Sequence, residues 1–130
     1  MILVDSSVWI DYFLGRDTPQ VAILDRTLGM RPVGIGDLML TEVLQGFRDD
    51  RQFEIAKNLL GDLPMFNLLG REMAMKSAAN FRSLRKKGIT IRKTADVIIA
   101  TYCIEHQLPL LFSDKDFLPF VRHFQLQEAL

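Results

Sequence analysis

Four acidic residues, spread along the whole chain, stand where a predicted strand meets a helix or in the first turns of a helix. They are Asp5 in MILVDSS, Glu42 in LTEVLQG, Asp96 in KTADVIIA and Asp114 in LLFSDKDF, with Asp116 two residues further on. Carboxylates are costly to bring together unless a cation neutralises them. If the fold brings these residues together, we therefore expect a site for a hard divalent metal ion, and hence a metal-dependent enzyme.

Short apolar runs alternate with amphipathic segments, and these are the elements that must position the acids. Strands are predicted at 1–4, 32–36, 65–69 and 110–112, with an edge strand near 124–126. Helices are predicted at 8–13, 19–28, 38–47, 51–60, 71–87 and 95–108, with a short one after SDKDF. Asp37 and Thr94 are the expected N-caps of two of these helices. The alternation predicts one α/β domain over residues 1–130, with a parallel sheet flanked by helices on both faces.

In an open α/β sheet, the ligand site lies outside the carboxyl ends of the strands. Asp5 closes the first predicted strand and Asp114 follows a late one, so both are expected there. Each acid also has an ordinary structural explanation. Asp96 can complement a helix N-terminus, Asp116 can cap the last helix, and Glu42 can be a surface acid. Asp5 is the hardest to explain in this way, because it ends a strand that is otherwise Met-Ile-Leu-Val.

Composition describes a globular protein of ordinary domain size: 130 residues, of which 48% are hydrophobic and 25% charged. No apolar run approaches the ~20 residues of a membrane span, and the start lacks the positive region of a signal peptide. The single cysteine, Cys103, excludes an internal disulfide and is expected to be a small buried residue on a helix. It fits a reducing compartment, and we expect a cytoplasmic protein without membrane contact.

Charge is distributed unevenly, although the net charge is zero. The interval between Glu72 and Asp96 contains no acidic residue and holds seven basic ones: Lys76, Arg82, Arg85, Lys86, Lys87, Arg92 and Lys93. A basic stretch that ends at a carboxylate suits a site that binds phosphate beside a metal. A solvated helix end explains the cations at 85–87 equally well.

Other families with an acidic α/β crevice can be excluded from the residues present. A phosphoaspartate phosphatase needs D-x-D after the first strand, and a response-regulator receiver needs an acidic pair there, but Ser6 and Ser7 follow Asp5. Gly34 and Gly36 form G-x-G, yet Met39 replaces the third glycine of a dinucleotide fingerprint. Neither a phosphate-binding GxxxxGK[ST] loop nor a G-x-S-x-G elbow occurs. A metal site remains.

Taken together, DSSVWIDYF, LTEVLQGF, ADVIIA and LLFSDKDF resemble the PIN-domain ribonucleases, and among them the VapC-type toxins of toxin–antitoxin systems. The resemblance runs from Asp5 to Phe117. It implies a PIN-like fold with a Mg²⁺ or Mn²⁺ site at the carboxyl edge of the sheet. The catalytic quartet of the family corresponds to Asp5, Glu42, Asp96 and Asp114. Asp5, Asp96 and Asp114 are then the principal metal ligands, and Glu42 is a ligand or a base that orients water.

The resemblance also implies secondary site residues and partners. Asp116 matches an additional metal-binding acid and is able to exchange roles with Asp114, while Ser6 and Ser113 correspond to small hydroxyl residues that line the site. The implied partners are RNA, a VapB-like antitoxin and a second copy in a homodimer. Trp9, Tyr12 and Phe13 are candidates for those protein contacts unless they are core residues. The RNA-contact candidates are Arg82, Arg85, Lys86, Arg92 and Lys93.

The sequence leaves two alternative functions possible. The first is a PIN-like module without catalysis that binds RNA or serves assembly. The complete acidic set argues against it. The second is a metal-dependent phosphatase for small molecules, which activity on a mononucleotide but not on RNA would favour.

Overall fold

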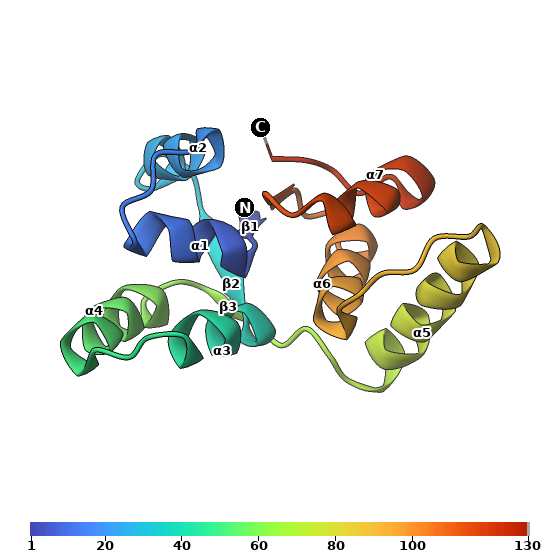
Figure 1. The fold of residues 1–130 in the computed structure, drawn as a ribbon, viewed down its shortest axis with the longest axis horizontal. Coiled ribbons are helices and arrows are strands. Elements are labelled where there is room, and N and C mark those ends of the chain that lie inside the picture. Colours follow the sequence, from blue (N-terminus) through green and yellow to red (C-terminus); the bar gives the residue numbers. More distant parts are fainter. Residues whose placement is uncertain (130) are drawn as a thin grey trace.

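A computed structural model of the protein describes residues 1–129 (Figure 1). The strands are β1 (Ile2–Val4), β2 (Val33–Gly36), β3 (Met65–Phe66) and β4 (Leu110–Leu111). The α-helices are α1 (Ser6–Phe13), α2 (Pro19–Thr27), α3 (Asp37–Gln45), α4 (Asp50–Gly61), α5 (Arg71–Lys86), α6 (Thr94–Glu105) and α7 (Leu118–Phe124), with a 3₁₀ turn, η1, at Lys115–Phe117. Across the part that the structure describes, no helix is long and apolar enough to cross a membrane.

The strands form one parallel sheet in the order β3-β2-β1-β4. The register pairs Leu3 of the central strand with Gly34 on one side and Leu110 on the other. Figure 1 shows α1 to α4 on one face of the sheet and α5 to α7 on the other. The predicted α/β class, with a parallel sheet between two helical layers, is confirmed.

The core is continuous from the sheet into both helical layers, and β1 lies at its centre. Ile2, Leu3 and Val4 are all buried, as expected for a parallel strand covered on both faces. Gly36 lies at the end of β2, against the buried Leu68 side chain. A Cβ atom at position 36 would clash with Leu68. The end of β2 therefore needs glycine because of close packing.

The aromatic residues of α1 are mainly core residues. Trp9 is completely buried, and its ring stacks on Phe13 and meets Tyr12 edge to face. Trp9 is therefore a core residue, which is one of the two alternatives given above, and is unsuited to a surface contact. Tyr12 and Phe13 are half-buried, and Phe13 packs against Phe47, next to α3.

Several predicted boundaries and caps were wrong by a few residues. Gly36, not Asp37, occupies the N-cap of α3, and Asp37 uses its Oδ1 to accept hydrogen bonds from the amides of Leu38 and Leu68. Lys93, not Thr94, is the N-cap residue of α6, and it makes no side-chain cap. Asp37 and Thr94 were predicted because their side chains cap helices well. In both helices the backbone becomes helical one residue earlier, a shift of the size that is common at helix ends.

The predicted edge strand near 124–126 is also wrong. Helix α7 continues to Phe124, and Gln125 then adopts a left-handed conformation with φ of 60°. The chain pairs with β4 only further on, through a single parallel bridge between Leu110 and Glu128. The apolar Leu126 belongs to the core, which explains the apolar pattern that resembled a strand.

Candidate metal centre

The order in which successive strands are added to the sheet reverses between β1 and β4. The connections from β1 through β2 to β3 run along one face, and the connection from β3 returns over the other face to β4. At such a switch point, the loops after the two neighbouring strands separate and leave a place for a ligand. Asp5 follows β1 directly, and Asp114 follows β4 by three residues. The two acids therefore meet at the edge where this fold class binds ligands.

Asp5 is the N-cap of α1 and is almost completely buried. Its Oδ2 accepts hydrogen bonds from the Ser7 hydroxyl at 2.6 Å and from the Ser7 amide at 3.3 Å. Its Oδ1 is buried and has no partner among the described residues. Burial raises the pKa of Asp5 above its usual range, the Ser7 bonds oppose the rise, and the charge of Asp114 adds to it. One carboxylate oxygen is thus left for a cation.

Ser7 is a site residue that the sequence reasoning did not single out. A hydroxyl two residues after an acidic N-cap is the available signal, because Asp at an N-cap and Ser in the first turn form local hydrogen bonds of this kind. By holding Oδ2, Ser7 fixes the orientation of the Asp5 carboxylate.

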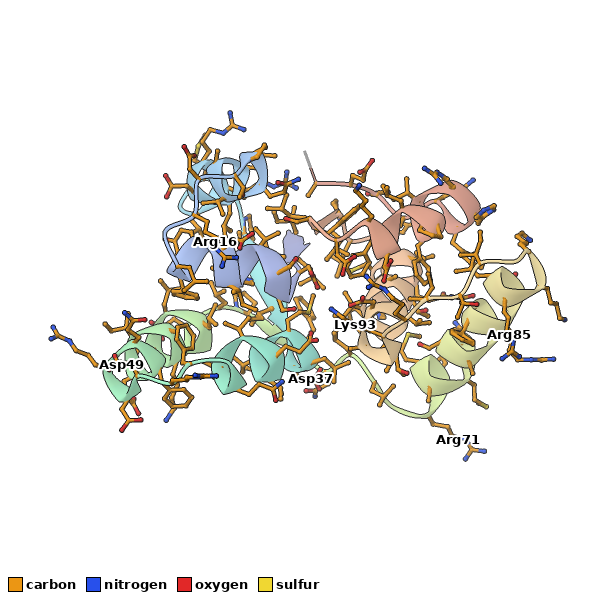
Figure 2. All side chains as sticks on the ribbon, in the orientation of Figure 1. Arg16, Asp37, Asp49, Arg71, Arg85 and Lys93 are labelled. Atoms are coloured by element: carbon orange, nitrogen blue, oxygen red, sulfur yellow. The ribbon has the colours of Figure 1, made fainter. Side chains whose placement is uncertain are left out.

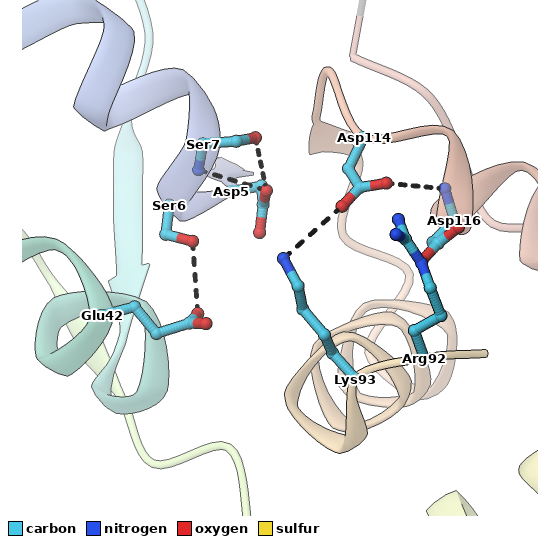
Figure 3. Close-up of polar contacts among 8 residues, drawn as sticks. All are labelled: Asp5, Ser6, Ser7, Glu42, Arg92, Lys93, Asp114 and Asp116. Carbon is cyan, nitrogen blue, oxygen red and sulfur yellow. Dashed lines mark hydrogen bonds and ion pairs between the residues drawn. The ribbon is translucent and has the colours of Figure 1, made fainter.

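Glu42 reaches the site from α3, one strand further along the sheet. The Ser6 hydroxyl donates a hydrogen bond to its Oε1 at 3.2 Å (Figure 3). Burial raises the pKa of Glu42, and the neighbouring charge of Asp5 raises it further, whereas Ser6 and the Lys93 ammonium act in the opposite direction. Glu42 thus lies within electrostatic reach of both Asp5 and Lys93.

Asp96 lies in the first turn of α6 and is buried. Its Oδ2 has no hydrogen-bond partner within the described part of the chain. Burial raises its pKa to about 7, with further contributions from the charges of Asp5 and Asp114 and an opposing one from Lys93. A buried aspartate that titrates near neutrality among other carboxylates is characteristic of a functional site.

Asp114 and Asp116 lie on the turn after β4. Asp114 is the N-cap of η1, where its Oδ1 accepts the Asp116 amide at 2.9 Å. Asp96, Asp114 and Asp116 each offer one carboxylate oxygen, and these three oxygens lie within 4.8 Å of one another. Oxygen ligands at this spacing, with a buried unpartnered oxygen on Asp96, fit a hard cation such as Mg²⁺.

Two basic side chains border this acidic group. Arg92 Nε donates to Asp116 Oδ2 at 3.0 Å, and Lys93 Nζ lies 3.9 Å from Asp114 Oδ2. Figure 3 shows Lys93 pointing between the pair Asp5 and Glu42 on one side and Asp114 on the other. Both cations come from the end of the predicted basic stretch, immediately before α6.

Other predicted residues lie elsewhere. Arg82 and Arg85 line a hollow of about 560 Å³ between α5 and α6, together with apolar side chains such as Phe81 and Ile98. The Arg85 guanidinium lies over the Phe81 ring at 5.4 Å from its centroid. Figure 2 shows Arg85 on the outer side of α5, away from Lys93. The structure does not bring these two arginines to the acids.

Lys86 and Ser113 also stay outside the acidic group. Lys86 is exposed in the last turn of α5, where it complements the carboxyl end of the helix. Ser113 is exposed and lines a separate hollow of about 180 Å³ with Gln20, Lys115 and Glu128. Of the two predicted site-lining serines, therefore, Ser6 contacts an acidic residue and Ser113 faces the other hollow.

Comparison with known proteins identifies the family. The model of the PIN domain family matches residues 2–120. This chain belongs to the PIN-domain family. Among curated relatives, the PIN protein is 31% identical to Ribonuclease VapC11 of Mycobacterium tuberculosis over 133 residues, covering 99% of this chain and 98% of the relative. It is 28% identical to Ribonuclease VapC1 of Methanocaldococcus jannaschii, covering 97% of this chain and 85% of that protein.

A solved structure shares the same fold. A chain of VapBC2 from Rickettsia felis, crystallised with a DNA fragment from its promoter, superposes with a TM-score of 0.77 at 16% identity. The match covers 99% of this chain and 98% of that one. The described residues therefore share this fold, and the acidic group lies at the carboxyl edge of its sheet.

Proposed function

We propose that this PIN protein is a metal-dependent endoribonuclease of the VapC toxin type, which hydrolyses phosphodiester bonds of RNA. The observation that carries the proposal is the pair of buried carboxylate oxygens without partners among the described residues, Asp5 Oδ1 and Asp96 Oδ2. Asp96 forms a close group with Asp114 and Asp116, and Asp5 lies outside that group but within electrostatic reach of Asp114. Buried charge of this kind needs a cation. The full-length relatedness to proteins named as ribonucleases supports RNA as the substrate.

Each acidic residue receives a role in this proposal. Asp5, Asp96 and Asp114 hold Mg²⁺ or Mn²⁺, and Asp116, which pairs with Arg92 in this structure, is a further ligand. When bound, the ion stabilises the charge that develops on the phosphoryl oxygens and makes the attacking water more acidic. Ser7 keeps the Asp5 carboxylate in place.

The proposed role of Glu42 concerns the attacking water. Its Oε1 is held by Ser6, and burial together with the nearby charge of Asp5 raises its pKa. A carboxylate with raised basicity is a better proton acceptor for water than an exposed one. We therefore assign Glu42 to orienting the water and accepting its proton, with contact to the metal as its alternative role.

Arg92 and Lys93 are the RNA-contact residues that the geometry supports, because they lie beside the acids. Contacts from these side chains to phosphate position the backbone without reading the sequence. Arg82, Arg85 and Lys86 have no comparable support, since the first two line the hollow between α5 and α6.

The proposed protein partner is a VapB-like antitoxin that covers the active site. An apolar hollow of about 110 Å³ on α1 and α3, lined by Ile10, Leu14, Val43, Gly46 and Phe47, is a suitable contact for it. Leu14 is 55% exposed in this hollow. We therefore propose Leu14, in place of the buried Trp9, as the apolar residue that contacts the antitoxin. We further propose a homodimer, and the cytoplasm as the compartment, consistent with the buried reduced Cys103.

The test is cleavage of purified total RNA by the isolated full chain, with Mg²⁺ or Mn²⁺ and again with EDTA. Asp5→Asn is the informative variant, because asparagine keeps the N-cap and the shape but removes the charge. Asp25→Asn, on the exposed face of α2, is its matched control. Discrete fragments from wild type and control that disappear with EDTA and with Asp5→Asn support the proposal. Full cleavage by Asp5→Asn would overturn the site, and no cleavage with either metal would favour the binding-module alternative.

A further inference from the structure

Arg92 and Lys93 are largely exposed, and their charged groups contact the acids of the site. Their side chains are 73% and 59% exposed, and each reaches one acid of the turn after β4, Asp116 and Asp114 respectively. Exposed ion pairs of this kind contribute little to stability. Both contacts can therefore be broken at small cost when another cation competes for the carboxylates.

The two cations contact two of the three acids whose oxygens lie within 4.8 Å of one another. Arg92 Nε binds Asp116 Oδ2, and Lys93 Nζ approaches Asp114 Oδ2. Lys93 thus neutralises the same negative charge that would attract a metal ion.

A divalent ion and these side chains cannot share the carboxylates without strong repulsion between cations. We propose that Arg92 and Lys93 are internal competitors of the catalytic metal: they neutralise Asp116 and Asp114 in the metal-free protein and are displaced when the ion binds. The inference rests on the proposed metal-dependent function. Metal binding then frees two cations directly beside the bound ion, where the phosphate of a substrate can replace the lost carboxylate partners.

This arrangement predicts a measurable energetic coupling. Removing the Lys93 charge should strengthen binding of Mn²⁺ by a factor on the order of 5 to 150, the usual range of coupling between two ligands of one site. Arg92→Gln should act in the same direction. Lys93→Arg keeps the charge and should bind Mn²⁺ within a few-fold of wild type.

The experiment is a titration of the metal-depleted full chain with Mn²⁺, followed by electron paramagnetic resonance of unbound Mn²⁺. The variants are Lys93→Met, Lys93→Arg and Arg92→Gln, with Lys57→Met on the exposed face of α4 as the matched change of charge. Tighter binding by Lys93→Met and Arg92→Gln but not by Lys57→Met is expected. Equal affinity of wild type and Lys93→Met, or an equal gain in Lys57→Met, would overturn the inference.

A second readout follows the displacement itself. Acetylation of Lys93 by a water-soluble ester, measured by peptide mass spectrometry relative to Lys57, should become faster when Mn²⁺ is added. An unchanged ratio would contradict displacement. If wild type binds no Mn²⁺ at all, the proposed metal function fails too, whereas normal binding with unresponsive Lys93 variants rejects only this inference.

Discussion

The Ser6 hydroxyl donates a 3.2 Å hydrogen bond to Glu42 Oε1, and this bond joins the start of α1 to the second turn of α3. Ser6 and Glu42 are 36 residues apart in the chain. The bond connects the helices that follow two neighbouring strands, β1 and β2, and it is the contact through which the proposed water-orienting residue is fixed. Removing the hydrogen bond between Ser6 and Glu42 should thus affect catalysis more than folding.

Replacing Ser6 by alanine is expected to lower kcat/KM for RNA cleavage about 10- to 100-fold, the usual effect of losing a group that orients a metal-site residue. The pKa of Glu42 should rise further, because the Ser6 bond opposes its rise. Stability should change by only about 1 kcal/mol. Cleavage rates and thermal unfolding of Ser6→Ala and Ser6→Thr check this expectation. Normal kcat/KM in Ser6→Ala would contradict it.

Ser113→Ala is expected to leave cleavage unchanged. Ser113 is exposed and lines the hollow with Gln20 and Lys115, and it makes no hydrogen bond to an acid among the described side chains. The same cleavage assay measures it beside Ser6→Ala. A loss of activity as large as that of Ser6→Ala would show that Ser113 lines the active site after all.

The Asp96 carboxylate should make the metal-free protein less stable as the pH rises. Its pKa is raised from 3.8 to about 7 in the folded protein, so the folded form holds the proton more tightly than the unfolded chain. The resulting stability is fully present below pH 4 and is lost as the pH rises through about 7. The loss is roughly 4 kcal/mol at most, at 1.36 kcal/mol per pKa unit.

Urea unfolding of wild type and Asp96→Asn in EDTA, between pH 5 and 9, measures this effect. The variant should gain stability over wild type at the alkaline end and show a flatter dependence on pH. The same curves in excess Mn²⁺ should reverse the order, because only the ionised aspartate binds the metal. Parallel pH curves for the two proteins in EDTA would contradict the raised pKa.

Arg92→Gln is expected to weaken RNA binding and to reduce the slope of log affinity against log salt concentration by about 0.7, the contribution of one phosphate contact to a single strand. Arg85→Gln should change neither quantity comparably, because Arg85 lies over Phe81 on the outer side of α5. Binding to RNA at several salt concentrations, with EDTA to prevent cleavage, separates the two variants. A larger effect of Arg85→Gln than of Arg92→Gln would indicate that RNA binds along α5.

The pattern of elements was predictable because each depends on local signals. The buried run at β1 and the glycine after α1 identify the first strand and helix, and alternation of strands with helices requires a parallel sheet. Given the sheet, Asp5 and Asp114 had to lie at one edge. The convergence of the acids therefore followed from topology, although their chemical roles remain predictions.

The features that could not be predicted from the sequence depend on packing between segments. The RNA-contact role of Arg82 and Arg85 stays a prediction. Arg82 and Arg85 were grouped with Arg92 and Lys93 because all four are close in sequence. In the structure, however, Arg82 and Arg85 are exposed residues at the border of the hollow between α5 and α6. The edge strand at 124–126 failed for a related reason, since Leu126 is apolar to fill the core rather than to extend the sheet.

The most direct test of the metal site is anomalous diffraction from crystals of the full chain grown with Mn²⁺. We expect at least one anomalous peak at direct coordination distance from carboxylate oxygens of Asp96 and Asp114, with Asp5 completing the site. Lys93 should have moved away from Asp114. A peak elsewhere on the protein, or none from crystals whose protein cleaves RNA in the same solution, would contradict it.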